Sequence, residues 1–277
     1  MKKLSTSKVV KSNELINASY SLSLNEQRIL LCCVAQINST ESLPKDNTFK
    51  VHVHEIACLV GDDHKGSLYK YIKEASQSLF DRTIRIKNSE SVVELRWIYK
   101  KAQYFDQEGC VEITFSPDII PYLSAISARF TQYHLKDVTQ FKSTYAIRLY
   151  ELLMQWQSLG TREISVTDLR ELFCLQNKYP KIAELRRNVI DKAITDINKF
   201  SNLQVDVKTR KRGKTIVAFK FAYETKNTLG INQVKNQVEK TYYGYTKTEI
   251  DKIAKPGETY FQAGSRLHKL ALENDTK

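Results

Sequence analysis

The chain has 277 residues, 42% of them apolar and 10% aromatic, which is enough material for about two domains with cores of their own. No run of about 18 apolar residues occurs and no continuous apolar core follows the first lysines, which argues against a membrane-spanning helix and a signal peptide. Five cysteines, odd in number and without C-x-x-C spacing, exclude a disulfide framework and a zinc site of that kind. We therefore expect a soluble, cytoplasmic protein that uses neither cofactor nor metal and has no membrane partner.

The first half of the chain predicts an α+β module. Residues 1–20 are polar and rich in Lys and Ser, which is typical of an N-terminal arm. Ser23 and Glu26 then form a capping-box pattern before an apolar helix that runs to about Ile37. The elements expected next are a strand at 49–51, a short helix at 53–60 ended by Gly61, a helix at 67–80, strands at 84–86, 92–99 and 111–115, a helix start at 116–118 and a strand at 129–135.

A second module is expected from about Lys136. Residues 137–140 are predicted to form a hinge, and Phe141 to Trp156 a strongly apolar helix. The elements expected next are a short strand at 163–164 and a short helix at 166–173.

The stretch from Lys178 to Thr215 is the most basic part of the chain. Apolar residues recur there at three- and four-residue intervals, which predicts a helix at 181–199 with one buried face. Two strands follow, joined by a flexible basic loop at 209–214. Between Lys178 and Lys214, eleven Lys and Arg stand against four Asp and Glu, a surplus of seven out of the chain's net +12. Because this charge is concentrated on one helix and one hairpin, nucleic acid is favoured over an acidic membrane surface.

The two halves repeat the same pattern. Val53-x-Glu55-Ile56 recurs as Val166-x-Asp168-Leu169 after 113 residues, Ile72 as Ile190 after 118, and Ile84-x-Ile86-Lys87 as Val205-x-Val207-Lys208 after 121. Each half thus has the element order of a winged helix, although any two α+β modules share some periodicity. The expected fold is α+β, with two tandem winged helix-turn-helix domains at 21–135 and 136–225. An arm at 1–20 precedes them, and a polar, partly helical tail at 226–277 follows.

Several blocks of sequence carry a resemblance to a known family. They are Lys11-Ser12-Asn13-Glu14-Leu15, Leu22-Ser23-Leu24-Asn25-Glu26-Gln27-Arg28, Ser143-x-Tyr145-x-Ile147-Arg148-Leu149-Tyr150-Glu151-Leu152-Leu153, Leu169-Arg170-Glu171-Leu172-Phe173, Tyr179-Pro180 and Leu185-Arg186-Arg187. With these blocks, residues 8–223 resemble the iteron-binding replication initiators of theta-replicating plasmids, the RepB/RepE kind. The tail after Tyr223 has no counterpart.

The resemblance implies a function. A member of this family binds direct repeats of double-stranded DNA, the iterons, at a plasmid origin. It opens the origin and recruits the host replication initiator and helicase. The resemblance also implies plasmid copy control, and often a homodimer that represses the initiator's own promoter.

Candidate DNA-binding residues follow from the charge pattern and from the resemblance. By resemblance, Arg186 and Arg187 match the family's base- and phosphate-contacting arginines. An arginine can form bidentate hydrogen bonds with O6 and N7 of a guanine, a geometry that lysine cannot reproduce. The full set of candidates is Lys178, Lys181, Arg186 and Arg187 at the helix, Arg210, Lys211, Arg212 and Lys214 on the wing, and Lys65, Lys70 and Lys73, the last three only by analogy with their place in the repeat. The competing interpretation is that these residues are ordinary solvated side chains.

Two other functions stay open at this point. His52-Val53-His54 mimics the metal-binding His-hydrophobe-His pattern of rolling-circle nicking endonucleases, with Tyr69, Tyr71, Tyr242 or Tyr243 as the nucleophile. No acid or third histidine stands in clear ligand spacing, so we expect no catalytic residue and no enzyme. A plain winged-helix transcriptional repressor is the other alternative, since it would use the same fold and the same contacts.

Overall fold

The computed structural model describes residues 7–37, 46–61, 65–87, 91–100, 102–105, 108–123, 129–226, 262–263 and 266, with the backbone alone at 65–67. Its contacts divide the chain into two units, Met1–Lys226 and Asn227–Lys277. The predicted tail therefore lies almost wholly outside the described residues, as do the loops at 38–45 and 88–90. Within the described part, no helix is long and apolar enough to cross a membrane.

The first half of the larger unit begins its helix-turn-helix with α2 (Leu24–Gln36). The predicted capping box is confirmed, because Glu26 N donates to Ser23 Oγ at 3.3 Å and Ser23 N donates to Glu26 Oε2 at 2.5 Å. The elements that follow are β2 (Thr48–His52), α3 (Val53–Val60), α4 (Lys65–Ser78) and the 3-10 turn η2 (Leu79–Asp81). Gly61 ends α3 with φ +70, a left-handed conformation that favours glycine.

The strands of the first half form three separate antiparallel sheets, one of which is the pair β1–β7 described below. β3 (Thr83–Lys87) pairs with β4 (Val92–Arg96) as the first wing, whereas β2 pairs with β6 (Cys110–Thr114). β6 pairs in turn with β5 (Gln103–Phe105), a strand that the sequence pattern did not reveal. The remaining elements of this half are η3 (Pro117–Ile119), α5 (Ile120–Leu123) and β7 (Phe130–His134).

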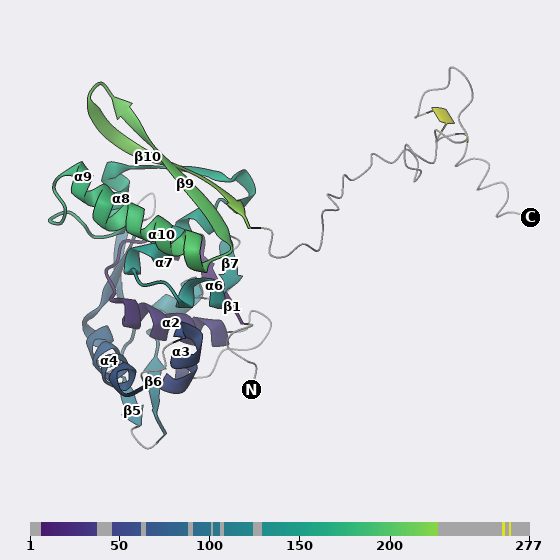
Figure 1. The fold of residues 1–277 in the computed structure, drawn as a ribbon. Helices are drawn as coiled ribbons and strands as arrows, with labels where there is room; N and C mark the ends of the chain where they lie inside the picture. The colour runs from purple at the N-terminus through teal and green to yellow at the C-terminus, as the bar shows by residue number, and fades with distance from the viewer. Residues whose placement is uncertain are drawn as a thin grey trace, which may run out of the picture. The chain divides into compact units, whose positions relative to one another are not determined.

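The second half starts with the apolar helix α7 (Thr144–Met154), followed by the turn η4 (Gln157–Leu159). The elements after it are β8 (Thr161–Ser165), α8 (Val166–Leu172), α9 (Ile182–Leu185), the π-helical turn η5 (Arg186–Ile190), α10 (Asp191–Phe200), β9 (Leu203–Arg212) and β10 (Thr215–Thr225). One antiparallel sheet in the order β8-β10-β9 covers this helical layer (Figure 1). Within the described chain, this half is therefore a complete winged helix.

The two halves share their order of helices and strands but differ in their sheets. In the second half the short strand β8 pairs with the wing strand β10, while in the first half the equivalent strand β2 pairs with the extra strand β6. The expected tandem winged helices are present, and the insertion of β5 and β6 explains why the repeat is not symmetrical. The exact boundary near residue 136 stays a prediction.

Two expectations about connecting segments were wrong. The predicted arm at 1–20 contains β1 (Lys8–Ser12), which pairs with β7, and the short helix α1 (Asn13–Ile16). Leu15 and Ile16 are fully buried, so this stretch is part of the core because its apolar residues pack there. The predicted hinge at 137–140 is instead the short helix α6 (Lys136–Thr139), in which Val138 is fully buried.

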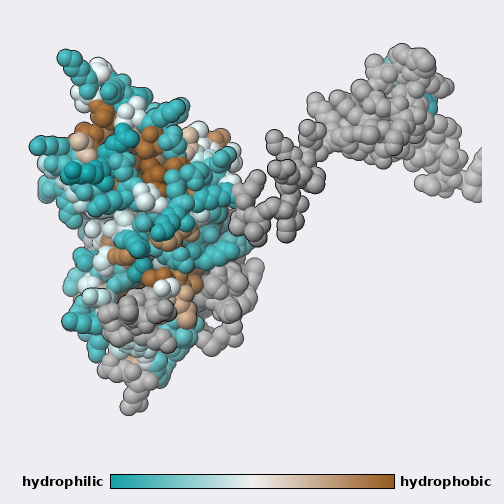
Figure 2. Space-filling view, in the orientation of Figure 1, coloured by the Kyte–Doolittle hydropathy of each residue, from teal (hydrophilic) through white to brown (hydrophobic). Residues whose placement is uncertain are grey.

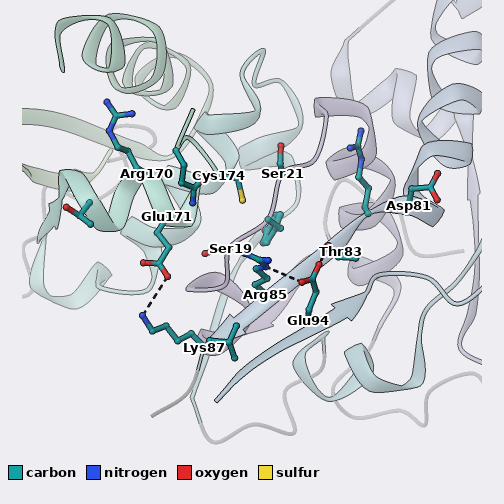
Figure 3. A pocket seen from close by; sticks show the side chains of 15 residues that line it. Ser19, Ser21, Asp81, Thr83, Arg85, Lys87, Glu94, Arg170, Glu171 and Cys174 are labelled. Atoms are coloured by element: carbon teal, nitrogen blue, oxygen red, sulfur yellow. Dashed lines mark hydrogen bonds and ion pairs between the residues drawn. The ribbon is translucent and has the colours of Figure 1, made fainter. Parts of the chain in front are cut away.

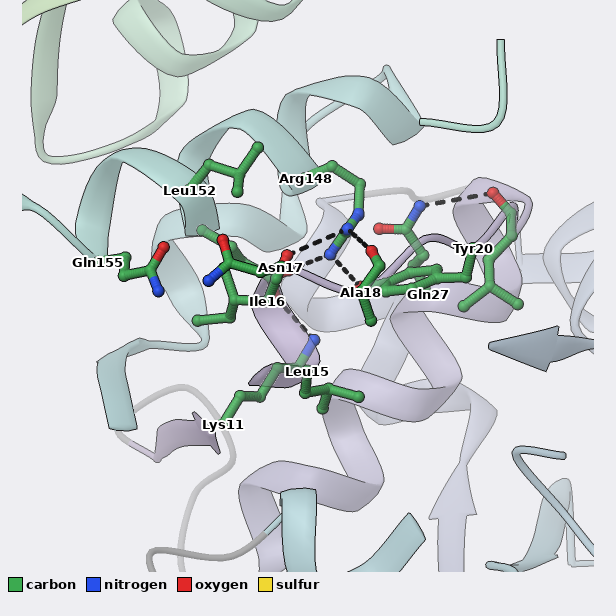
Figure 4. Close-up of polar contacts among 12 residues, drawn as sticks. Lys11, Leu15, Ile16, Asn17, Ala18, Tyr20, Gln27, Arg148, Leu152 and Gln155 are labelled. Carbon is green, nitrogen blue, oxygen red and sulfur yellow. Dashed lines mark hydrogen bonds and ion pairs between the residues drawn. The ribbon is translucent and has the colours of Figure 1, made fainter. Parts of the chain in front are cut away.

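A buried polar network joins this N-terminal segment to α7 (Figure 4). Arg148 Nη2 donates to the carbonyl oxygens of Ile16 at 3.2 Å and Ala18 at 2.7 Å. Arg148 Nη1 donates to the hydroxyl of Tyr20 at 2.6 Å, and the guanidinium lies 3.8 Å above the Tyr20 ring. Because the guanidinium is buried, these contacts satisfy a charge that would otherwise be costly.

Candidate nucleic-acid interface

The predicted basic helix is present as the continuous run α9, η5 and α10, from Ile182 to Phe200. Its inward stripe consists of Leu185, Val189, Ile190, Ala193 and Ile197, all fully buried. Arg186 and Arg187 open the π-helical turn in the middle of this run, and both are exposed. Turns of this kind often occur at functional sites, because they change the direction of the side chains around them.

Two polar anchors fix α10 to the rest of its domain. Asp196 Oδ2 accepts hydrogen bonds from the backbone N–H groups of Lys142 and Ser143, both at 2.8 Å, just before α7 begins. Asn198 exchanges two hydrogen bonds with the backbone of Val205 on β9, at 2.9 and 2.7 Å. The helix, α7 and the wing are thus held in one geometry, which a site that reads DNA requires.

The wing is more ordered than the sequence suggested. The flexible loop expected at 209–214 was wrong, because β9 continues to Arg212 and β10 begins at Thr215. Only Gly213 and Lys214 form the turn, and Gly213 has φ +61, which a two-residue hairpin turn demands. Figure 1 shows this hairpin projecting beyond α9 and α10, and Figure 2 shows hydrophilic side chains over its tip.

Strand alternation divides the basic residues of the wing between two faces. Val205, Val207 and Thr209 turn toward the helical layer, and Lys211 continues this face toward the tip. Lys208, Arg210 and Arg212 point the opposite way. Arg210 Nε lies 2.8 Å from Glu163 Oε1 on β8, with side chains 54% and 39% exposed. Of the candidates on β9, Lys211 is therefore the one that shares a face with the basic helix.

Most of the candidates in this half have no competing charge partner. Arg186 Nε lies 3.4 Å from Asp191 Oδ1, but the side chains are 44% and 49% exposed, so the pair is weak. Among the residues that the structure describes, Lys178, Lys181, Arg187, Lys211, Arg212 and Lys214 form no ion pair or hydrogen bond through their side chains. A DNA phosphate could contact these groups without displacing a protein partner.

The three candidates of the first half lie on α4, away from this cluster. Lys70 is exposed and its Nζ is 3.9 Å from Glu74 Oε1 one turn later, while Lys73 Nζ lies 4.9 Å above the Tyr104 ring. The backbone of Lys65 belongs to α4, but its side chain is outside the description. The structure thus places all three on the helix that the repeat assigned to DNA reading.

A cleft of about 950 Å³ separates the first wing from α8 (Figure 3). Lys87 on β3 and Glu171 on α8 face each other across it at 3.7 Å, with side chains 70% and 51% exposed. Arg85 Nε lies 3.2 Å from Glu94 Oε2, and Arg82 Nε lies 2.8 Å from Glu26 Oε1. Arg82, Arg85 and Lys87 are therefore already matched by acids, and the fourth cation of the cleft, Arg170, is held by backbone carbonyls, which distinguishes the cleft from the wing and the basic helix.

The histidine pair of the nuclease alternative does not form a metal site in the described structure. His52 ends β2 and His54 lies in α3, with ring centroids 6.2 Å apart. Within the residues described, no group of three or more His, Cys, Asp or Glu is placed to hold a metal ion. Tyr69 and Tyr71 lie on α4, and Tyr242 and Tyr243 fall outside the described residues.

The sequence pattern missed one residue that shapes this site. In the sequence, Arg170 looks like an ordinary exposed polar residue. In the structure, its guanidinium donates hydrogen bonds to the loop that leads into the basic helix. The only signal in the sequence was its place in the block Leu169 to Phe173, which gave no role. Its contacts can be recognised only in three dimensions, because its partners are backbone carbonyls.

Comparisons with known proteins agree with this architecture. The sequence model described as "Initiator Replication protein, WH1" matches residues 8–154, and that described as "Initiator Rep protein, WH2" matches residues 165–223. A "Replication initiation protein" of Escherichia coli is 29% identical over 240 residues, covering 83% of this chain and 74% of that protein. The "PI protein" of Escherichia coli is 25% identical over 252 residues, covering 78% and 82% of the two chains.

A solved structure shares the fold. The crystal structure of Pi initiator protein in complex with iteron DNA superposes with a TM-score of 0.69 at 25% identity, covering 81% of this chain and 99% of that chain. The first family model alone spans more than half of the 277 residues. The chain therefore belongs to the initiator replication protein family, whose members carry two winged-helix domains, WH1 and WH2.

Proposed function

We propose that this protein initiates plasmid replication by binding repeated double-stranded DNA sites, the iterons, at an origin. The observation that carries the proposal is the exposed pair Arg186 and Arg187 on a rigidly anchored helix beside a basic wing. Its membership of the initiator family and its likeness to an initiator crystallised with iteron DNA support the same function.

The physical mechanism begins with the second winged helix. The α9-η5-α10 run enters the major groove, where Arg186 and Arg187 read base edges and bind phosphate. Lys178, Lys181 and the wing residues Arg210, Lys211, Arg212 and Lys214 contribute phosphate contacts, which position the protein but carry no sequence information. With about 6–10 phosphates neutralised, affinity should fall by roughly 10³–10⁵ between 50 and 200 mM salt.

The first winged helix contributes a second DNA-binding helix. In this proposal, α4 with Lys65, Lys70 and Lys73 enters another major groove about 34–36 Å away on the same face of the duplex. Several copies bound side by side then bend or melt neighbouring A·T-rich DNA. The origin opens through binding energy rather than bond cleavage, so the protein acts without an enzymatic step. The host replication initiator and helicase are the proposed next partners, and a homodimer is the proposed repressing form.

Replication in trans tests this function. A plasmid that carries the DNA flanking this coding region, but no other origin, is introduced into cells that supply the protein from the chromosome. The proposal predicts that the plasmid is maintained, and that Arg186→Ala abolishes maintenance. A plain repressor would bind the same DNA without supporting replication. A covalent tyrosyl adduct on origin DNA incubated with manganese would instead indicate a nicking enzyme.

A further inference from the structure

We propose that Arg170 is a positioning residue that fixes the chain entering the second DNA-reading helix without touching DNA itself. The proposal rests on the function proposed above. Arg170 lies on α8 and, like Thr167 and Glu171, lines the cleft beside the first wing. Glu171 points toward Lys87 across that cleft (Figure 3), whereas the guanidinium of Arg170 contacts the loop at 175–180.

The guanidinium of Arg170 holds four backbone carbonyls of one loop. Its Nη1 donates to the carbonyl oxygens of Leu175 at 3.1 Å and Lys178 at 2.8 Å. Its Nη2 donates to those of Tyr179 at 2.6 Å and Pro180 at 3.2 Å. These four residues lie at 175–180, in the segment that leads into Lys181 and α9, so a single side chain contacts the backbone along its path into the helix.

The loop needs this support because its backbone is unusual. Cys174 and Tyr179 both have left-handed backbone angles, with φ of +52 and +53, which residues other than glycine adopt only when their surroundings hold them. Lys181, the residue at the start of α9, makes no side-chain capping hydrogen bond. No side-chain cap therefore fixes this helix start, and the Arg170 contacts fix the direction of the chain just before it.

The contacts also explain why arginine is required. The planar guanidinium presents several donors in fixed directions, so it can serve four carbonyls at once, whereas a lysine ammonium presents three donors from a single atom. The same contacts occupy both terminal nitrogens, so they are not available to a phosphate. Arg170 would then act on DNA recognition through the orientation of the helix that carries Arg186 and Arg187.

The test compares Arg170→Lys with a matched control, Arg162→Lys. Arg162 is an arginine of the same winged helix that also donates to a carbonyl, that of Leu152, but it is far in sequence from the reading helix and serves another part of the domain. Both variants keep the charge, so a change in binding cannot come from a lost cation. The measurements are hydrogen exchange of the free protein and competition gel shifts on repeat DNA and on unrelated DNA at several salt concentrations.

For Arg170→Lys, we expect faster amide exchange at 175–185 and a specific affinity at least about tenfold lower, comparable to one misplaced base contact. The affinity for unrelated DNA and the salt dependence should stay at wild-type values. Arg162→Lys should bind repeat DNA as the wild type does. A merely destabilising role would lower binding equally in both variants.

Three results would overturn the proposal: unchanged amide exchange in the loop, unchanged specific affinity, or a parallel loss of unrelated-DNA binding and salt dependence, which would make Arg170 a phosphate contact. If the wild type fails to discriminate repeat DNA, the function proposed above fails. The exchange measurement still decides whether Arg170 holds the loop.

Discussion

Lys11 Nζ lies 2.6 Å from Glu151 Oε1, although 140 residues separate them in the chain. Both side chains are buried, and Glu151 also accepts a hydrogen bond from the Tyr133 hydroxyl at 2.6 Å. Lys11 and Glu151 belong to two of the blocks on which the family resemblance rests. Those blocks therefore meet in the core between β1 and α7, both within the residues that the WH1 model matches, and the proposed DNA contacts lie elsewhere.

Breaking this pair should destabilise the protein strongly. Glu151→Gln leaves the Lys11 ammonium buried without its counter-charge, which typically costs about 3–5 kcal/mol. Urea unfolding followed by circular dichroism measures the loss. The double variant Lys11→Met with Glu151→Gln should recover part of it, because neither charge then remains buried alone. Equal losses in the single and double variants would contradict this account of the pair.

Stability should also depend on pH through Glu151. Burial alone would raise the pKa of this carboxyl, but the charges of Lys11 and Arg148 and the hydrogen bonds from Lys11 and Tyr133 hold it below its usual value of 4.5. A group with a lowered folded-state pKa stabilises the protein above its unfolded pKa and loses that contribution as the pH falls through the folded one. Between pH 7 and 3, urea midpoints of the wild type should fall more steeply than those of Glu151→Gln. Parallel curves would contradict the prediction.

Replacing Arg186 or Arg187 with alanine should remove specific DNA binding. Each base contact of this kind contributes about 1–3 kcal/mol of discrimination, so the preference for repeat DNA over unrelated DNA should shrink accordingly. The fold should be retained, because both side chains are exposed. Competition gel shifts and circular dichroism measure the two quantities.

Lys50→Ala is the matched control for these variants. It removes one positive charge from β2, where Lys50 Nζ lies 3.2 Å from Glu112, and no DNA contact is proposed for it. We expect it to bind repeat DNA as the wild type does. Specific binding that survives in both arginine variants, or that falls equally in Lys50→Ala, would refute the assignment of the reading helix.

The two faces of the wing should behave differently. Lys211→Ala should lower affinity for repeat and unrelated DNA alike and reduce the salt slope by about 0.9, the value for one lost phosphate contact. Arg210→Ala should change the slope less, because Arg210 lies on the opposite face and is paired with Glu163. The salt dependence of binding, measured for both variants, separates them. A larger effect of Arg210→Ala than of Lys211→Ala would show that the outer face meets the duplex more closely than the inner face.

Patterns in the sequence predicted the longer helices well, because each had a local signal, whereas the four-residue helices α1 and α6 were missed. Ser23 and Glu26 marked the start of α2, Gly61 marked the end of α3, and apolar spacing marked the run from α9 to α10. The wing strands were recognised from alternation, but their length was not. Charged residues such as Arg210 and Arg212 resemble a loop in sequence, and pairing with β10 keeps them in the strand.

The features that the sequence did not reveal depend on distant partners. Residues 8–20 were predicted to be an arm because they are rich in polar residues. The sequence does not show that one of these residues, Lys11, has a buried partner on α7. The extra strand β5 is only three residues long and exists through pairing with β6. Arg170 belongs to the same class, since its partners are carbonyls and carbonyls have no signature in sequence.

DNase I footprinting on the DNA flanking the coding region tests the central claim most directly. If two winged helices read one face of a repeated duplex site, the protein should protect evenly spaced segments of the same sequence. Each segment should span two successive major grooves about 34–36 Å apart. Arg187→Ala should erase this pattern at protein concentrations where Lys50→Ala preserves it. Protection at a single site without repeats, or a pattern indifferent to Arg187, would contradict the account.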